Sequence, residues 1–375
     1  MKTPLELYIH IPFCIRKCDY CDFLSFSSTR EQQKTYMEAL KREIRAAGTF
    51  PEHHVTTVFF GGGTPSVPEA ELLAEVLELL RERFQLDQDA EITLEANPGT
   101  LSEEKLRIYR EAGFNRLSLG CQSVHSEELK QLGRIHTYEE FLESFSMARK
   151  QGFSNINVDL MSGLPGQSLK SYEESLRTIA KLGPEHISAY SLIVEPGTPF
   201  AERDLDLPDE DTERHMYDRT GEILGAYGYT QYEISNYAKS GCECRHNIGY
   251  WKRISYLGFG PGAASLLGNR RFTNTTDMER YLTDSGCPEM VREDVEVLSA
   301  QDCMEEFMFL GLRMNEGISE KQFEELFGQR IDEVYGQVLK KYLILEMLWR
   351  SNGRIGLTRE GISISNVILA DFLLG

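Results

Sequence analysis

The sequence has no long apolar run and comparatively little positive charge. Its apolar stretches, such as residues 57–60, are far too short to cross a bilayer. The first residues, 1–7, lack the apolar core and cleavage site of a signal peptide, so we expect a cytoplasmic protein whose thiols stay reduced. With 40 Lys and Arg against 59 Asp and Glu, the net charge is −19, which argues against nucleic acid as a partner and against electrostatic binding to anionic lipid.

Eight cysteines in a reduced chain are candidates for metal ligands or core residues, not disulfides. Cys14, Cys18 and Cys21 stand close together, just after the apolar run 7–11. Thiolate is the usual ligand of iron–sulfur clusters, and three thiolates leave one iron of a four-iron cluster free for another ligand. The alternative is a buried helical stripe, because the spacing i, i+4, i+7 also suits a helix. Pro12 and the neighbouring charged residues disfavour that alternative.

Short apolar runs alternate with longer segments of helical periodicity over the first 240 residues. The predicted strands are 7–11, 57–60, 92–96, 116–119, 156–160 and 186–193. The predicted helices are 31–47, 69–83, 102–112, 138–151 and 169–182. This alternation indicates an α/β fold with a parallel sheet, and the pattern alone does not separate an open sheet from a barrel.

The cysteine spacing and the residues before it carry a family resemblance. The lead-in Tyr8-x-His10-x-Pro12-Phe13, followed by Cys-x3-Cys-x-aromatic-Cys, resembles the radical S-adenosylmethionine (SAM) superfamily. Within it, the lead-in resembles the branch that contains oxygen-independent coproporphyrinogen III oxidase and the HemW-type haem chaperones. The resemblance implies a partial (β/α)6 radical SAM barrel and a [4Fe–4S] cluster on Cys14, Cys18 and Cys21. It also implies that SAM caps the open iron, with the chemistry at the carboxyl ends of the strands.

Glycines and polar residues follow the predicted strands, where such a barrel would bind its ligand. On their own these residues are equally well explained as turns, helix caps and core residues. Taken with the resemblance, they predict a pocket for SAM in which Arg134 faces the carboxylate, Asp159 a ribose hydroxyl and Ile193 the adenine. The predicted SAM residues are Tyr8, Gly62, Gly63, Thr64, Glu95, Gln122, Arg134, Asp159 and Ile193.

A second motif, His246-Asn247-x-x-Tyr250-Trp251, resembles the His-Asn-x-x-Tyr-Trp signature of the HemW-type chaperones. An imidazole can ligate haem iron and aromatic rings offer flat faces to a macrocycle, so His246 is the predicted haem ligand. The alternative is a packed aromatic cluster around a core histidine. Cys242 and Cys244 precede the motif, and their role is left open, since two cysteines and one histidine are too few for a closed zinc site.

Three regions are expected: a radical SAM partial barrel over 1–240, an extension carrying the histidine motif over 241–298, and a winged-helix-like domain over 299–375. In the last region the pattern predicts helices at 305–313, 319–327 and 331–342, a strand at 354–359 and a final helix at 361–374. That region is not notably basic, which favours a lid or docking role over DNA binding.

Two functions remain open at this point. The first is a haem chaperone of the HemW type. For such a chaperone the resemblance implies a [4Fe–4S] cluster, SAM and haem as cofactors. It also implies an electron donor and apo-haemoproteins of respiration as partners, and peripheral association with the membrane. The second is an oxygen-independent coproporphyrinogen III oxidase. Phe23 stands where the oxidase pattern has a further cysteine, which favours the chaperone and argues against coproporphyrinogen oxidase activity. A redox-sensing winged-helix regulator is a more remote third hypothesis. The sequence pattern does not show whether SAM is cleaved during the functional cycle, nor which oligomeric state the protein adopts.

Overall fold

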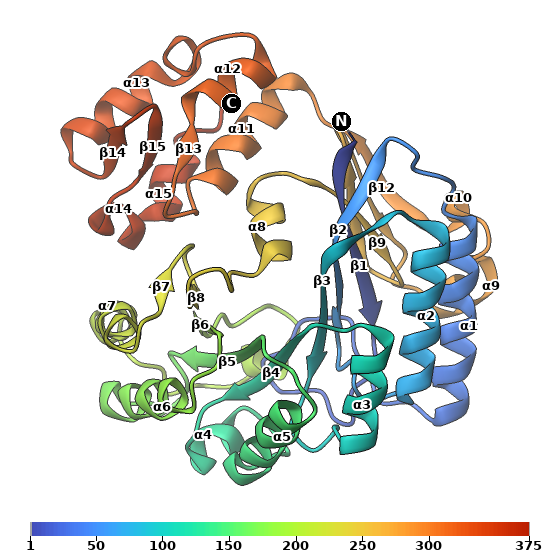
Figure 1. Ribbon diagram of the computed structural model, residues 1–375. Helices are drawn as coiled ribbons and strands as arrows, with labels where there is room; N and C mark the ends of the chain where they lie inside the picture. The colour runs from blue at the N-terminus through green and yellow to red at the C-terminus, as the bar shows by residue number, and fades with distance from the viewer. Residues whose placement is uncertain (1, 375) are drawn as a thin grey trace.

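One twelve-stranded sheet dominates the computed structural model, which describes residues 2–374 (Figure 1). Its central strands are parallel and follow chain order, as the alternating pattern predicts. They are β1 (Thr3–Ile11), β2 (His53–Gly62), β3 (Leu86–Ala96), β4 (Arg116–Gln122), β5 (Ile156–Ser162) and β6 (His186–Ser191). Strands β7 and β12 lie at the two ends of the strand order and do not pair with each other. The sheet is therefore an open, partial barrel. The predicted fold class is thereby confirmed.

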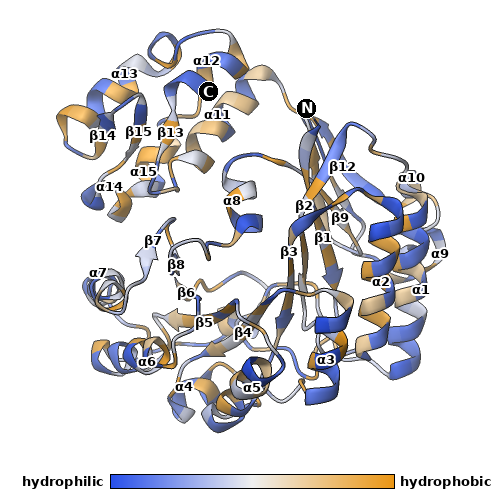
Figure 2. Cartoon of the chain, viewed as in Figure 1, coloured by the Kyte–Doolittle hydropathy of each residue, from blue (hydrophilic) through white to orange (hydrophobic). Residues whose placement is uncertain are grey.

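Helices between these strands cover the outer face of the sheet, and their apolar sides pack against the apolar strands (Figure 2). Three of them begin at a capping box, in which Thr29, Thr137 or Ser168 satisfies free backbone N–H groups. The helices are α1 (Arg30–Ala46), α2 (Ala70–Arg83), α3 (Glu103–Ala112), α4 (Ser126–Gln131), α5 (Tyr138–Lys150) and α6 (Leu169–Leu182). The short helix α4 is an addition to the predicted set.

Residues beyond β6 extend the sheet at both ends. On one side α7 (Glu210–Ala226) leads to β7 (Thr230–Gln231) and β8 (Asn236–Ala238), and β8 pairs antiparallel with β6. On the other side β9 (Ser255–Phe259) pairs parallel with β1 and is followed by β10 (Ala264–Leu267), β11 (Arg270–Asn274) and β12 (Arg292–Val297). The short helices here are α8 (Arg245–Trp251), α9 (Met278–Asp284) and α10 (Pro288–Val291).

A buried carboxylate joins this extension to the barrel. Glu43 on α1 accepts hydrogen bonds from the backbone N–H of Gly260 (2.9 Å), the amide of Asn274 (2.6 Å) and the hydroxyl of Tyr281 (2.6 Å). Burial raises the pKa of Glu43, and these three donors oppose the shift. Glu43 therefore ties three segments of the extension to α1, in addition to the pairing of β9 with β1.

Replacing Glu43 with alanine should lower the free energy of unfolding by about 3 kcal/mol, because it removes the acceptor of three buried hydrogen bonds. Urea unfolding of the full chain measures this change. Glu38→Ala is the matched control: Glu38 lies on the same helix, its side chain is 59% exposed, and its ion pair with Lys41 is worth little. Equal losses in the two variants would show that the buried contacts do not anchor the extension.

The last part of the chain has its own apolar core and a small three-stranded sheet in the order β13–β15–β14. Its elements are α11 (Ala300–Gly311), β13 (Ile318–Ser319), α12 (Glu320–Phe327), α13 (Ile331–Ile344), β14 (Leu348–Ser351), β15 (Arg354–Leu357), α14 (Arg359–Ser363) and α15 (Ser365–Ala370). The prediction of one final helix over 361–374 was wrong. The chain leaves helical geometry at Ile364 (φ −121°, ψ 25°), which separates α14 from α15.

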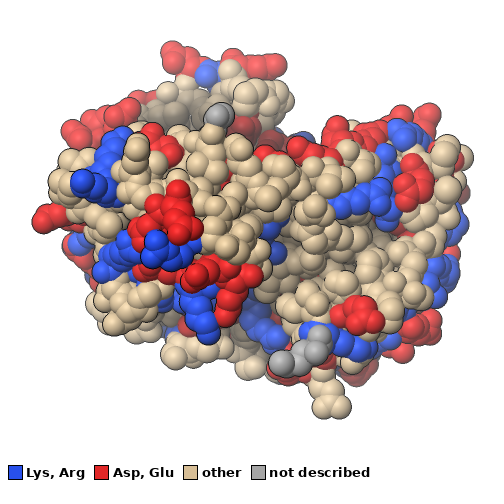
Figure 3. Space-filling view, turned by 90° about the horizontal axis from the view of Figure 1, so that it is seen from above, with Lys and Arg blue, Asp and Glu red and all other residues tan. Residues whose placement is uncertain are grey.

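Acidic and basic side chains are interspersed on the face shown in Figure 3. Among residues 2–374, no helix is both long enough and apolar enough to span a bilayer. The region boundaries near residues 240 and 298 stay predictions. Strands β9–β12 lie in the same sheet as β1, whereas α11 begins the separate core.

Candidate cofactor site

The loop between β1 and α1 carries the three closely spaced cysteines and is held by backbone hydrogen bonds. The N–H of Cys14 donates to the carbonyl of Phe26 (3.0 Å), and the N–H of Phe26 donates to the carbonyl of Pro12 (2.9 Å). Phe13 is buried between these contacts and meets the ring of Tyr36 edge-on, with centroids 5.1 Å apart. The loop is therefore fixed at its two ends, and the cysteines stand between them.

All three cysteines line one cavity of about 140 Å³ at the carboxyl ends of the strands, here called the thiol cavity. The structure brings most of the predicted SAM residues to the same cavity: Gly62, Gly63, Thr64, Glu95, Gln122, Arg134 and Asp159. These residues come from the ends of β2, β3, β4 and β5 and from the segment after α4. Their convergence supports a shared binding site for the predicted set.

The glycine-rich segment after β2 packs directly against the start of the cysteine loop. The N–H of Gly63 donates to the carbonyl of Ile11 (2.9 Å), and the N–H of Thr64 donates to that of Phe13 (2.7 Å). A Cβ atom at Gly63 would lie 2.9 Å from three backbone atoms of Ile11 and Phe13. Only glycine fits this close approach without displacing the loop.

A chain of hydrogen bonds crosses the floor of the thiol cavity. Thr64 Oγ1 lies 3.5 Å from Cys14 Sγ and accepts from the amide of Asn97 (2.8 Å). The amide oxygen of Asn97 accepts from Arg134 (2.8 Å), which also donates to the hydroxyl of Tyr20 (3.0 Å). Asn97 and Tyr20 were missed as site residues. The signal available for Asn97 was its position directly after a predicted strand.

Gln122 reaches the thiol cavity because β4 is irregular at its end. The β4–β5 register shifts between Gly120 and Gln122, and Gln122 adopts φ +64°, a left-handed conformation uncommon for residues other than glycine. Its Oε1 atom and the Nε atom of Arg134 are buried without a hydrogen-bond partner among the described residues. A polar ligand in the cavity would satisfy both atoms, so the cavity suits a ligand with donor and acceptor groups.

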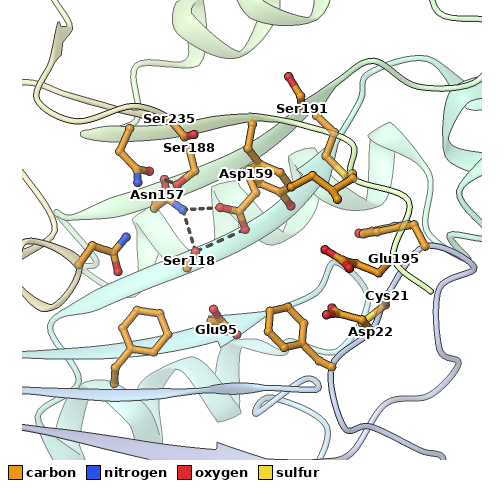
Figure 4. A pocket seen from close by; sticks show the side chains of 18 of the residues that line it. Cys21, Asp22, Glu95, Ser118, Asn157, Asp159, Ser188, Ser191, Glu195 and Ser235 are labelled. Carbon is orange, nitrogen blue, oxygen red and sulfur yellow. Dashed lines mark hydrogen bonds between the residues drawn. The ribbon is translucent and has the colours of Figure 1, made fainter. Parts of the chain in front are cut away.

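Two carboxylates face this region from β3 and β5. Burial, and secondarily the neighbouring Asp159, raises the pKa of Glu95 to about 8. Burial also raises the pKa of Asp159, opposed by hydrogen bonding from Asn157, whose amide lies 2.7 Å from it, and by Arg116 and Arg134. Glu95 and Asp159 also line an adjoining cavity of about 450 Å³, here called the barrel-mouth cavity, together with Asp22, Arg116 and Glu195 (Figure 4).

The thiols fit a cluster better than a single metal ion. Burial raises the pKa of Cys18 and Cys21, so metal binding must displace their protons. No three donor side chains among residues 2–374 are close enough to share one metal ion, and all eight cysteines are free thiols. A four-iron cluster does not require donors that converge on one metal ion, since each thiolate binds a different iron. The residues present therefore fit a [4Fe–4S] cluster.

Two predicted SAM residues lie outside the thiol cavity. Tyr8 bonds to the Nδ1 atom of His10 (3.1 Å) and lines a different cavity beside β9. Ile193 lies beyond the end of β6, is 68% exposed and borders the barrel-mouth cavity. Tyr8 is thus apart from the other predicted SAM residues, whereas Ile193 shares the barrel-mouth cavity with Glu95 and Asp159.

In this conformation both ring nitrogens of His246, the predicted haem ligand, make hydrogen bonds within the protein. The ring is 1% exposed, with Nδ1 2.7 Å from Thr57 Oγ1 and Nε2 3.0 Å from the hydroxyl of Tyr250. It stacks on Phe59 with centroids 5.0 Å apart, and burial lowers its pKa to about 3. This geometry matches the alternative of a packed aromatic cluster around a core histidine, since both ring nitrogens already make hydrogen bonds.

Cys242 and Cys244 form no metal site with this histidine among the described residues. Cys244 is buried, and its thiol lies 3.6 Å from Glu91 Oε1. The same carboxylate accepts from the N–H groups of Arg245 (3.1 Å) and His246 (3.2 Å) at the start of α8. Cys244 thus belongs to the packing that holds α8 in place.

Comparison with known proteins agrees with this geometry. The radical SAM superfamily model matches residues 8–179, and the HemN C-terminal domain model matches residues 298–364. The heme chaperone HemW of Bacillus subtilis is 39% identical over 98% of both chains, and that of Lactococcus lactis is 36% identical over 100% of this chain and 98% of the relative. The solved structure of Escherichia coli coproporphyrinogen III oxidase (HemN), a radical SAM enzyme, superposes with a TM-score of 0.86 at 27% identity, over 100% of this chain and 91% of that one. The chain therefore belongs to the HemW-type branch of the radical SAM superfamily.

Proposed function

We propose that this protein is a haem chaperone that binds a [4Fe–4S] cluster, SAM and haem and delivers haem to apo-haemoproteins. The observation that carries the proposal is the 39% identity with a relative named as a haem chaperone, over nearly the full length of both chains. The convergence of three thiols and the glycine-rich segment on one cavity supports its cofactor part.

Cys14, Cys18 and Cys21 would hold the cluster, which supplies one iron free of protein ligands and a reducing electron. The residues around it would position SAM. Arg134, fixed by Asn97 and Tyr20, supplies positive charge for a carboxylate, and Gln122 supplies an unpaired acceptor. Glu95 and Asp159 supply carboxylates for a cationic and hydroxyl-bearing ligand. The buried walls keep water away from these groups, which strengthens each interaction.

The affinity for SAM should depend on the ionisation of Glu95. The sulfonium of SAM is positive at every pH, so it favours the ionised form of Glu95. In the protein without SAM the pKa of Glu95 is about 8. Affinity should therefore fall as the pH drops below 8, by up to about tenfold per unit, because a proton must be released on binding. Equilibrium dialysis between pH 6.5 and 9 measures this dependence, in wild type and Glu95→Gln.

Comparing the pH profiles of SAM affinity in wild type and Glu95→Gln isolates the effect of Glu95, because titration of SAM's own amino group changes both profiles equally. We expect a steep dependence in wild type and a shallower one in Glu95→Gln. Parallel pH profiles would mean that Glu95 does not face the bound cation.

We place the protein in the cytoplasm, where thiols remain available as cluster ligands. The recipients we propose are apo-haemoproteins of respiration, reached through transient peripheral association with the membrane, and an external electron donor would reduce the cluster. Nucleic acid is not a proposed partner, given the net charge of −19.

The test separates the chaperone from the oxidase that its fold resembles. Anaerobically reconstituted protein is offered haem and coproporphyrinogen III in separate reactions, with SAM and a reductant. Tight haem binding, transfer to an apo-haemoprotein and no decarboxylation would support the proposal. Turnover to protoporphyrinogen IX without haem binding would overturn it in favour of the oxidase.

A further inference from the structure

A third cavity, of about 490 Å³, lies beside β9 and is separate from the predicted cofactor pocket; we call it the side cavity. Its walls come from β1 and the cysteine loop, from the extension including α8, and from α11, so three regions of the chain meet there. Its aromatic lining residues are Tyr8, Phe23, Tyr250, Tyr256 and Phe309. Such a concave space of several hundred Å³, lined by aliphatic and aromatic side chains, is typical of a site for a flat organic ligand.

Two arginines and one carboxylate supply the charge of the side cavity. Arg253 and Arg271 both bind Glu306, at 2.6 and 2.5 Å, and the carboxylate is 8% exposed. Arg253 holds this position with φ +53°, a left-handed backbone uncommon for arginine. His10 also lines the cavity, and burial lowers its pKa, so it adds no positive charge. One guanidinium charge is left over for an anionic ligand.

The barrel-mouth cavity has the opposite character, although its volume is similar. Four carboxylates line it, against the single guanidinium of Arg116. The labelled acids in Figure 4 are Asp22, Glu95, Asp159 and Glu195. The raised pKa of Glu95 leaves that carboxyl mostly protonated at neutral pH, but the remaining acids face Arg116 alone. The barrel-mouth cavity is therefore less favourable to an anionic ligand than the side cavity, because charges in such partly enclosed spaces are poorly screened.

Phe23 connects the two spaces. It lines the thiol, barrel-mouth and side cavities and is 60% exposed. On the far wall, Tyr250 is held by its hydrogen bond to His246 and meets Tyr256 edge-on, with centroids 4.7 Å apart. His246 is thus a positioning residue for an aromatic wall of the side cavity.

We propose that the side cavity binds the porphyrin, with its ring between the aromatic walls and its propionates on Arg253 and Arg271. This assignment rests on the proposed haem-binding function and locates it within the chain. Phe23 then lies between the porphyrin and the cysteine loop. A porphyrin propionate displaces Glu306 from the guanidinium groups, so Glu306 competes with the ligand.

The test titrates haemin, metal-free protoporphyrin IX and haem dimethyl ester into the full-length, cluster-containing protein under anaerobic conditions. Protoporphyrin needs no iron ligand, and the ester lacks free propionates. Ala264→Phe, which fills the side cavity, should weaken haemin and protoporphyrin binding by about tenfold or more. Ser191→Phe, which intrudes into the barrel-mouth cavity, is the matched control and should leave both affinities unchanged.

Charge variants keep the proposal testable if Ala264→Phe misfolds. Arg271→Gln should weaken haemin binding by about tenfold and leave the ester unaffected, whereas Glu306→Gln should strengthen haemin binding. Loss of binding in Ser191→Phe but not in Ala264→Phe or Arg271→Gln would overturn the side-cavity assignment and leave the chaperone function standing. Wild type that binds no haemin would overturn both.

Discussion

Cys18→Ala protein, reconstituted anaerobically, should contain iron and sulfide only at background level and show no reduced-cluster EPR signal. Cys18 lines the thiol cavity with Cys14 and Cys21, and no fourth cysteine lines that cavity. Two thiolates cannot hold a four-iron cluster whose third protein ligand is missing. Iron and sulfide analysis, with EPR of the dithionite-reduced protein, measures the effect.

Cys242→Ala and Cys287→Ala are the matched controls, because neither thiol lines the thiol cavity. Both proteins should keep the iron, sulfide and EPR signal of wild type. A full cluster in Cys18→Ala, or its loss in either control, would show that the ligands have been wrongly assigned.

Gly63→Ala should have the second large effect, on both the fold and the cluster. Its added methyl group would meet backbone atoms of Ile11 and Phe13 at 2.9 Å, and backbone cannot turn aside as a side chain can. We expect the free energy of unfolding to fall by about 2–3 kcal/mol through overpacking. The displaced cysteine loop should also take up less iron, which urea unfolding and iron analysis together would reveal.

Gly225→Ala provides the comparison, since a Cβ atom there meets nothing within 4 Å inside helix α7. That variant should be as stable as wild type or slightly more stable, because alanine restricts the unfolded chain. Wild-type stability and cluster content in Gly63→Ala would contradict the close packing of the glycine segment on the loop.

Much of the central sheet could be predicted because each strand and helix has a signal in its own stretch of sequence. Apolar runs mark β1–β6, and residues such as Thr29 and Ser168 cap the helices that follow. Pairings between distant segments have no such local signal. Strand β9 was not predicted, and nothing in the segment 255–259 indicates that it pairs with β1. The break at Ile364 was hidden for a related reason, since an apolar pattern continues through both short helices.

The candidate site was predictable where residues follow strands and resemble a family motif. Asn97 was missed because its role, linking Thr64 to Arg134, is visible only once two strand ends and the segment after α4 meet. His246 shows the opposite limit. Its motif marks an important histidine, but the surrounding fold decides that both ring nitrogens bond to Thr57 and Tyr250. A motif identifies residue types, and the packing around them determines which atoms remain free.

The central claim is that the three cysteines hold a cluster with one iron open to SAM. Electron–nuclear double resonance on the reduced, reconstituted protein, with SAM labelled by ¹⁵N at the amino group or ¹⁷O at the carboxylate, tests it most directly. We predict hyperfine coupling between the label and the cluster, absent when unlabelled SAM is used. An intact cluster that shows no coupling to bound SAM would contradict the account.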